Sequence, residues 1–399
     1  MESQDHAPRS VELGGGVRVA RRIADVPAED WDRLQAHEPE LAGPFVRHAF
    51  LAALEGSGSA APGAGWRPRH LLLERAGRLV AAAPAYLEAS SDGDFSRDWE
   101  WASAAAGAGL VYYPKLVLGV PATPVTGRRL LVGAGEDRGA AVAELVGAAR
   151  RLARAEGAGA LQVLFPPAAE ARELEAAGLA ARLDFQYHWR NAGYASFEEF
   201  LARFPSKRRT AIRRERRAPS EQGIALRTVP GPELARDPAG WARACFALHR
   251  GSTDRMAWGM RWVNEEFYAR VFAGLPGAAE VVEARREGRL VGMAFNLVGP
   301  RARFGRYWGC SEEHPFLHFN VALYHSIERC IEGGLERFEG GAGGEHKIAR
   351  GFEPAETWSA HAFADPRLDA AVRRQLADEV PARRRALERW RAEHPRLGG

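Results

Sequence analysis

The 399-residue sequence has only three cysteines, and their spacing builds neither a disulfide framework nor a zinc site. Cys245, Cys310 and Cys330 are odd in number, so they cannot all pair with one another, and no CxxC or Cys/His ligand pattern occurs. No stretch reaches the roughly 18 uninterrupted apolar residues of a membrane-spanning helix. The opening MESQDHAPRS lacks the basic region and apolar run of a secretion signal. We therefore expect a soluble, cytoplasmic protein.

The chain is long enough for two domains, and its positive charge is concentrated in one segment. The net charge is only +4, yet residues 207–217 hold seven basic side chains and one acid, Glu215, so the segment carries +6 and the remainder sums to −2. This confinement favours a local anionic partner, such as an RNA end or a phosphorylated co-substrate. The alternative is a solvated helix face on which Glu215 pairs with nearby arginines. The candidate anion-binding residues are Lys207, Arg208, Arg209, Arg213, Arg214 and Arg217.

A weak internal repeat organises the chain. The tetrapeptide GRLV occurs at 77–80 and 288–291, each time where a turn enters an apolar strand. A strand is expected before each copy, and a helix, a glycine turn and a strand after it. These elements are expected at 70–74, 139–155 and 161–165 in the first half, and at 280–285, 321–332 and 335–339 in the second. Two copies of one mixed α+β unit are the simplest architecture.

The stretch GGAGGEHKIARGFEP, residues 340–354, places a glycine turn directly before ionisable side chains. If it coils after the glycines, Glu345, His346, Lys347 and Arg350 fall within about one helical turn. Glycines at a strand end let backbone N–H groups approach a ligand, and the cations that follow could hold a phosphate or carboxylate. The stretch indicates an anion or acyl-donor site. Its alternative is a tight turn before a solvated helix end.

Several motifs resemble those of one bacterial family. SKRRTAIRRERR, QGIALRTV, GRLVGMAFNLVG and HKIARGFEP resemble the tandem acyltransferase fold of the Fem-type peptidoglycan aminoacyltransferases and their relatives in the GNAT superfamily. YYPKLVLGVPATPVTG, FQYHWRNAGY, GRYWGCSEEHPFLHF and GEHKIARGFEP are similar to the FemAB-like, or predicted N-acyltransferase, family. The resemblance spans about residues 45–365. It implies an α+β fold of tandem GNAT-like lobes, with mixed central sheets flanked by helices.

The resemblance also bears on the acyl donor. The acetyl-CoA signature of GNAT enzymes, a Gln or Arg followed by a glycine-bracketed turn at a helix start, is absent before either expected helix. In the second half Glu312 and Glu313 stand there, and their charge would repel a pyrophosphate. Fem-type enzymes use aminoacyl-tRNA. The resemblance therefore favours aminoacyl-tRNA over acyl-CoA, as a co-substrate rather than a tightly bound cofactor, with the basic segment contacting the RNA.

The expected chemistry selects candidate catalytic residues. An amine that attacks an activated ester needs a group to take its proton and donors to stabilise the oxyanion, and it needs no metal. The candidates beside the second-half motifs are Tyr307, His318, Glu345, His346 and Lys347. Lys347 and Arg350 match the Lys-x-Gly-Phe segment of the Fem pattern, lengthened here to KIARGF. The alternative is a buried hydrogen-bonding or loop-fixing role.

Polar residues at proline and glycine turns are typical of a pocket for a polar acceptor. An insertion is expected near 90–127, and the alternative role of its polar residues is the packing of this inserted subdomain. The candidate substrate-binding residues are Asp98, Lys115, Thr126, Arg128, His188, Arg190, Arg306, Trp308 and Arg350.

The sequence thus predicts an N-acyltransferase of Fem/GNAT type that transfers an acyl or aminoacyl group to an amine on a cell-wall precursor or small metabolite. The expected lobes are 1–185 and 186–365. A helical tail over 366–399 follows and could mediate self-association. The site is expected in the cleft between the two lobes, and the competing class is a non-catalytic module that binds a cell-wall precursor or amine ligand in that cleft.

Overall fold

The computed structural model describes residues 10–255 and 259–394. The chain divides into two compact units, Met1–Leu183 with Thr357–Pro381 and Asp184–Glu356 with Ala382–Gly399. The division differs from the expected lobes because residues 357–365 belong to the first unit, where they pair with a strand of that unit. Residues 1–9 and 395–399, at the ends of the expected first lobe and tail, lie outside the described residues.

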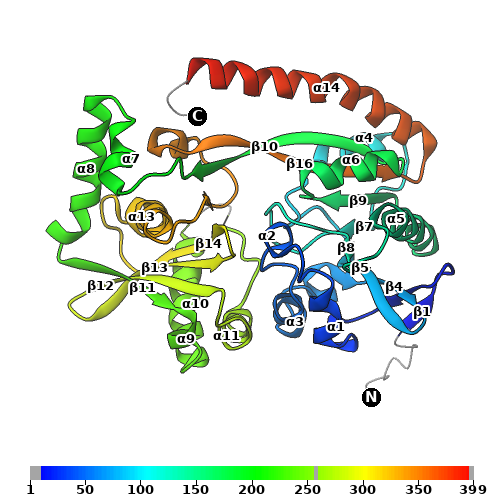
Figure 1. Cartoon of the computed structure of the whole chain (residues 1–399), viewed down its shortest axis with the longest axis horizontal. Helices are drawn as coiled ribbons and strands as arrows, with labels where there is room; N and C mark the ends of the chain where they lie inside the picture. The colour runs from blue at the N-terminus through cyan, green and yellow to red at the C-terminus, as the bar shows by residue number, and fades with distance from the viewer. Residues whose placement is uncertain (1–9, 256–258, 395–399) are drawn as a thin grey trace. The chain divides into compact units, whose positions relative to one another are not determined.

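The first unit contains two groups of strands (Figure 1). One is a sheet in the order β1-β2-β4-β5-β8, and the other runs β3-β6-β7-β9 and continues into the Thr357–Phe363 part of the last strand, β16. Strand β7 runs parallel to β9. The bounds are β1 (Ser10–Glu12), β2 (Val17–Ala20), β3 (Trp66–Pro68), β4 (His70–Arg75), β5 (Arg78–Ala83), β6 (Ala85–Glu88), β7 (Lys115–Leu118), β8 (Leu131–Val132), β9 (Ala160–Leu164) and β16 (Glu353–Phe363).

Helix α5 (Arg138–Ala155) covers the core of the first unit. It begins where the Asp137 carboxylate accepts a 3.0 Å hydrogen bond from the Ala140 N–H, a typical N-cap. Its apolar stripe, which includes Leu145 and Leu152, packs on the sheet residues. The other helices of this unit are α1 (Ala28–Arg33), α2 (Pro39–Ala42), α3 (His48–Gly56), α4 (Trp99–Gly107) and α6 (Ala168–Ala176), and α14 (Pro366–Glu393) begins in it.

The second unit is built on a sheet in the order β11-β12-β13-β14-β15, which ends on the His188–Arg190 part of β10 (Ala180–Arg190). Its strands are β11 (Ile224–Pro230), β12 (Ala279–Arg286), β13 (Arg289–Val298), β14 (Ala302–Cys310) and β15 (Arg337–Glu339). Its helices are α7 (Phe197–Ala202), α8 (Ser206–Glu221), α9 (Gly231–Leu234), α10 (Pro238–Asp254), α11 (Glu265–Gly274), α12 (Leu317–Phe319), the π-helix η3 (Asn320–Tyr324), α13 (His325–Glu332) and the 3-10 helix η4 (Glu345–Arg350).

The predicted repeat is confirmed. The glycine of each GRLV copy is the second residue of a two-residue hairpin turn with positive φ at both positions, Ala76-Gly77 in the first unit and Glu287-Gly288 in the second. Each hairpin is followed later in its unit by a helix and a strand, α5 and β9 in the first and α13 and β15 in the second. The expected insertion also supplies β7, which pairs with both β6 and β9.

Alternate residues of the second sheet face different layers. Ala294 packs with Leu317 and Val321, whereas the next residue, Phe295, contacts the aromatic rings of α11. This follows from the two-residue period of a strand. The α12–η3 layer therefore packs on the face of the sheet that carries Ala294, and the α10–α11 layer packs on the face that carries Phe295. Among the described residues, no helix is long and apolar enough to cross a membrane.

Candidate active site in the second unit

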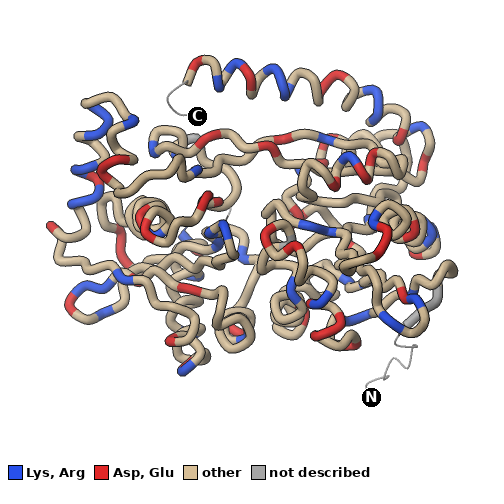
Figure 2. The backbone as a smooth tube through the Cα atoms, in the orientation of Figure 1, with Lys and Arg blue, Asp and Glu red and all other residues tan. Residues whose placement is uncertain are grey.

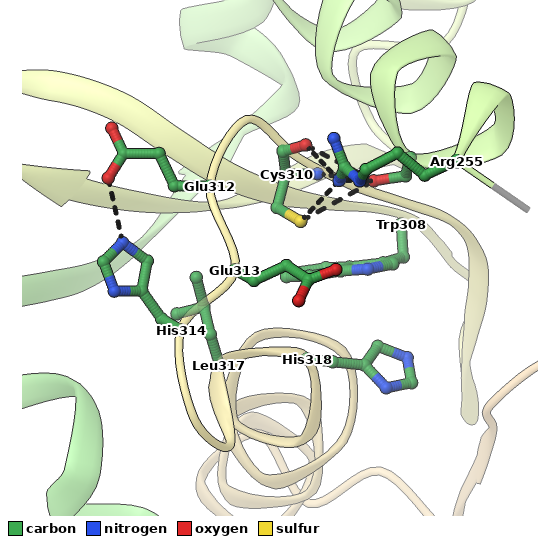
Figure 3. A pocket seen from close by; sticks show the side chains of 9 residues that line it. Arg255, Trp308, Cys310, Glu312, Glu313, His314, Leu317 and His318 are labelled. Carbon is green, nitrogen blue, oxygen red and sulfur yellow. Dashed lines mark hydrogen bonds and ion pairs between the residues drawn. The ribbon is translucent and has the colours of Figure 1, made fainter.

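The end of β14, the loop after it and α12 enclose a cavity of about 410 Å³ (Figure 3). Trp308 and Cys310 come from β14, Leu317 and His318 from α12, and the acidic loop lies between them. Chain reversal occurs at Phe316, whose φ of 63° is unusual for a bulky residue. Ser252 and Arg255, which complete the lining, come from the end of α10.

Most polar groups of this cavity already have partners. Arg255 donates to the Cys310 carbonyl oxygen at 2.9 Å, and Glu312 pairs with Arg289 and lies 3.2 Å from His314. Glu313 is exposed and forms no ion pair within the described part of the chain. Figure 3 shows Glu313, Trp308 and His318 around the same space. The cavity thus combines an aromatic ring, a histidine and a carboxylate that is available to a cation.

His318 is held in its neutral form. Its ring lies 5.2 Å from the Trp308 ring and 6.1 Å from the His346 ring, between centroids. Burial lowers the pKa of His318 to about 4, and the nearby His346, Lys347 and Arg350 add to the effect. A histidine in this state keeps an unprotonated ring nitrogen at neutral pH and can accept a proton.

Lys347 is buried without a carboxylate partner among the described side chains. Only 4% of its surface is exposed, and its Nζ donates a 2.6 Å hydrogen bond to the Gly341 carbonyl oxygen. Burial lowers the pKa of Lys347 to about 8. Its ammonium is therefore a strong hydrogen-bond donor that loses its proton just above neutral pH.

The predicted residues of η4 lie beside this lysine. The Arg350 guanidinium carbon lies 3.3 Å from the centre of the Phe319 ring, and the His346 ring lies 5.6 Å from the same ring. Glu345 begins η4, but its side chain is outside the described part of the structure. The structure thus brings together Trp308, His318, His346, Lys347 and Arg350. Their roles stay predictions.

Tyr307 and Arg306 do not join this group. The Tyr307 ring stacks on His249 of α10, with centroids 4.8 Å apart, and it also contacts Tyr268 and Phe295. Since neighbouring residues of a strand point to opposite faces, Tyr307 and Trp308 serve different layers. Burial raises the pKa of Tyr307 and lowers that of Arg306, whose guanidinium lies 5.7 Å from the Tyr307 ring centre. A catalytic role for Tyr307 alongside His318 has no contact to support it.

The two candidates on β10 differ in exposure. His188 is buried opposite Glu339, with its Nε2 3.7 Å from a carboxylate oxygen. Burial lowers the pKa of His188 despite this carboxylate, and Lys347 also acts to lower it. Arg190 is exposed at the end of the strand. His188 is therefore within electrostatic reach of Lys347.

Asp98 and Lys115 lie in a buried cluster of the first unit. The Lys115 ammonium donates to Asp98 at 2.8 Å and to Ser91 at 2.7 Å, pairs with Asp94, and lies 3.4 Å from Glu88. Burial alone would lower the pKa of Lys115, but the three carboxylates outweigh it and raise that pKa. Burial likewise acts to raise the pKa of Asp98, and Lys115 reverses the shift and holds it well below its usual range. Lys115 is thus held by carboxylates of its own unit, while both Glu88 carboxylate oxygens and Asp98 Oδ1 have no hydrogen-bond partner among the described residues.

Thr126 and Arg128 also lie in the first unit. Arg128 is 6% exposed and donates two hydrogen bonds to the Glu38 carboxylate, at 3.0 and 3.1 Å. Thr126 Oγ1 is buried and has no hydrogen-bond partner among the described residues. Neither residue lines the cavity beside His318, and their predicted contact with substrate stays a prediction.

The basic segment forms α8, and Figure 2 shows Lys and Arg along this helix. Several of these side chains already have partners. Arg213 pairs with Glu198 at 2.6 Å, Arg217 lies 3.5 Å from Glu221, and Arg209 donates to the Phe204 carbonyl oxygen. Lys207 and Arg214 have no carboxylate partner in the described part of the chain. The free charge of this surface is thus smaller than the sequence suggests.

Some residues of the site were missed from the sequence. Ser252 and Arg255 reach the cavity only because α10 packs beside β14, which no local pattern encodes. Cys310, Glu313 and His314 lie within the quoted GRYWGCSEEHPFLHF string, so their position beside Trp308 and His318 was a usable signal. Among the described residues, no group of three His, Cys, Asp or Glu side chains could hold a metal ion.

The fold of this chain is similar to those of several solved structures. The chain is similar to FemX, with 12% identity over 80% of this chain and 93% of FemX and a TM-score of 0.50. It is also similar to L-PGS from Bacillus licheniformis, with 12% identity over 88% and 97% of the two chains and a TM-score of 0.51. A tandem GNAT protein from the clavulanic acid biosynthesis pathway is 18% identical over 90% and 98%, with a TM-score of 0.42. The likeness to FemX and L-PGS confirms the predicted α+β fold.

The family model defines the class of this protein as one of peptidoglycan biosynthesis or recognition. The model of the FemAB-like family, described as peptidoglycan biosynthesis/recognition, matches residues 22–396. The chain therefore belongs to the FemAB-like family, as the motifs of the sequence predict. No curated protein sequence matches the chain.

Proposed function

We propose that the chain transfers an aminoacyl or acyl group to an amine of a peptidoglycan precursor, at the cavity beside His318. Membership of the FemAB-like family supports the reaction class and the kind of acceptor. The single observation that carries the proposal is the pairing of a neutral histidine with a buried lysine of lowered pKa. His318 lines the cavity, and Lys347 is close enough to lower the pKa of His318; perturbed groups at and beside a cavity are typical of catalytic sites.

The residues divide the chemistry between them. The acceptor nitrogen attacks the ester carbonyl carbon, so that a C–N bond forms while the C–O bond to the donor breaks. His318 takes the proton that leaves the nitrogen and returns it to the departing oxygen. The Lys347 ammonium donates a hydrogen bond to the oxyanion. Glu313 and Trp308 face the cavity and suit a positively charged group of the acceptor.

The donor we favour is aminoacyl-tRNA. Glu312 and Glu313 precede α12 and oppose a pyrophosphate at that helix start. Lys207 and Arg214 of α8 remain available for phosphate contacts.

The test is a transfer assay with purified protein, a peptidoglycan-precursor peptide bearing a free amine, and either labelled aminoacyl-tRNA or acetyl-CoA. We expect label from aminoacyl-tRNA on the peptide, and a fall of about 100-fold in turnover for His318→Ala, as for loss of a general base. The control is His325→Gln, because His325 is another buried histidine with a pKa of about 4 but bonds Thr228 away from the cavity. Transfer from acetyl-CoA alone would overturn the proposed donor, and equal losses in both variants would overturn the role of His318.

A further inference from the structure

Glu215 is the one acid within the basic run of α8, and it is buried. One carboxylate oxygen accepts hydrogen bonds from Tyr324 Oη and, at 2.9 Å, from Arg350 Nη2. The other accepts a 3.3 Å hydrogen bond from Arg208 Nη1. Its backbone carbonyl oxygen accepts from the Asn320 amide at 2.8 Å. Glu215 thus connects α8 with two other elements, η3 and η4.

The partners of Glu215 hold η4 at several points. Arg350 also donates to the His346 carbonyl oxygen at 2.9 Å, and Arg208 donates to the Ala349 carbonyl oxygen at 2.5 Å. Both guanidinium groups that fix this helix therefore depend on the same carboxylate. Within the described residues, Glu215 is the only carboxylate that pairs with Arg350.

The helix η4 needs such anchors. It is a six-residue 3-10 helix between Gly344 and Gly351, which both have positive φ, and its N-cap residue makes no side-chain hydrogen bond. Short 3-10 helices have poor hydrogen-bond geometry and little stability of their own. The orientation of His346 and Lys347 is therefore set by side-chain contacts.

Two further partners of Glu215 lie in η3, which begins two residues after His318. Asn320 and Tyr324 are the first and last residues of this π-helix, and both reach α8. π-Helical turns are rare and often lie at functional sites. Arg350 stacks on Phe319, between His318 and this turn. One buried carboxylate therefore fixes the elements that carry His318 and Lys347.

We propose that Glu215 is a positioning residue of the acyl-transfer site, which holds η4 against the α12–η3 turn through Arg350 and Arg208. This inference rests on the proposed function. Glu215 touches no reacting atom in this arrangement. The Glu215 carboxylate keeps η4 in place and thereby keeps Lys347 buried. Loss of the Glu215 charge would loosen η4 and admit water to Lys347.

The experiment follows Lys347 directly. Lys115, Lys207 and Lys347 are the only lysines of the sequence, so protein labelled with 13C at lysine Cε gives three side-chain signals, and Lys347→Arg identifies that of Lys347. The charged and ionisable groups near Lys347 are His188 on β10, His318 on α12, and His346 and Arg350 on η4. We expect the Lys347 signal to titrate near pH 8 in the wild type, and at least about one unit higher in Glu215→Gln.

The matched control is Glu328→Gln. Glu328 pairs with Arg216 of α8 at 2.7 Å but makes no contact with η4. It should leave the Lys347 titration unchanged.

In the transfer assay, Glu215→Gln should lower kcat at least about tenfold with acceptor KM within about twofold, since positioning acts on the transition state. Glu215→Asp should recover part of kcat.

An unchanged Lys347 titration in a folded Glu215→Gln protein would overturn the inference, as would equal shifts in both variants. If Glu215→Gln does not fold, Arg208→Gln tests the same anchor, because Arg208 bonds both Glu215 and the Ala349 carbonyl oxygen of η4. The titration needs no substrate. Failure to find transfer in the wild type would therefore contradict the proposed function and leave the positioning result to be judged separately.

Discussion

Two buried lysines, one in each unit, show how partners decide what a charge can do. Lys115 is fully buried among Glu88, Asp94 and Asp98, whereas Lys347 is 4% exposed and bonds a backbone carbonyl oxygen. Opposite charges outweigh burial and raise the pKa of Lys115, while burial alone lowers that of Lys347 to about 8. The first lysine is fixed in its charged form, and the second can change its charge near neutral pH.

The largest expected effect is on the stability of the first unit. Lys115→Met leaves buried carboxylates without their cation, and we expect it to lower the free energy of unfolding by about 3–5 kcal/mol. Urea unfolding at pH 7 measures this loss. A change below about 1 kcal/mol would mean that the cluster does not depend on the Lys115 charge.

Lys347→Met should have the opposite effect on stability. Below pH 8 the folded state holds a buried ammonium whose pKa is below that of the unfolded chain, so this group opposes folding there, and the penalty fades between about pH 8 and 10.4. The variant should gain about 1–3 kcal/mol in the free energy of unfolding at pH 7 and lose about 100-fold in turnover. Parallel urea unfolding and transfer assays test both. A folded variant that keeps full turnover would remove Lys347 from the reaction.

A smaller effect concerns Glu88, whose burial raises its pKa to about 10 against the opposing influence of Lys115. A raised carboxyl pKa stabilises the folded state fully below about pH 4.5, and this stabilisation is lost as the pH rises toward 10. Glu88→Gln resembles the protonated acid at every pH. It should equal the wild type near pH 4 and exceed it by about 2 kcal/mol at pH 6, as measured by urea unfolding at the two values. Equal stability at both would show that Glu88 is ionised in the cluster.

The smallest effect is expected at the α8 surface. Arg214→Gln removes a guanidinium without a carboxylate partner in the described residues, so binding of aminoacyl-tRNA should weaken a few-fold and its log–log salt dependence should fall by about one. Arg227→Gln is the control, because Arg227 is already paired with Glu233 and Glu283. Filter binding at several salt concentrations would show the difference. Equal slopes for both variants would argue against an RNA contact at Arg214.

Local signals predicted much of the fold. The paired hairpin turns, the apolar stripe of α5 and the glycines before η4 are each encoded within a few residues. The proximity of His318 to His346 was expected only from motifs, because it requires separate elements to pack together. Side-chain direction was not predicted from the sequence. Tyr307 and Trp308 are neighbours in sequence, yet strand alternation sends their rings to different layers.

The ion-pair partners of buried charged residues were also not predictable from the sequence. The sequence marks Asp98 and Lys115 as polar residues near turns, but it does not show that Glu88 and Asp94 enclose the same ammonium. It also presents Glu215 as one acid among seven cations, whereas the fold buries it and gives it Arg350, more than a hundred residues away, as a partner. Such long-range pairs depend on topology rather than local pattern.

The pH dependence of single-turnover kcat tests the account most directly, with Lys347→Arg as the comparison. His318 acts unprotonated and Lys347 acts as an ammonium, so kcat should rise through about pH 4 and fall above about pH 8. An arginine at 347 stays charged, so its reduced rate should not fall above pH 8. A wild-type kcat that stays level to pH 9.5, or an identical fall in Lys347→Arg, would contradict the role of Lys347.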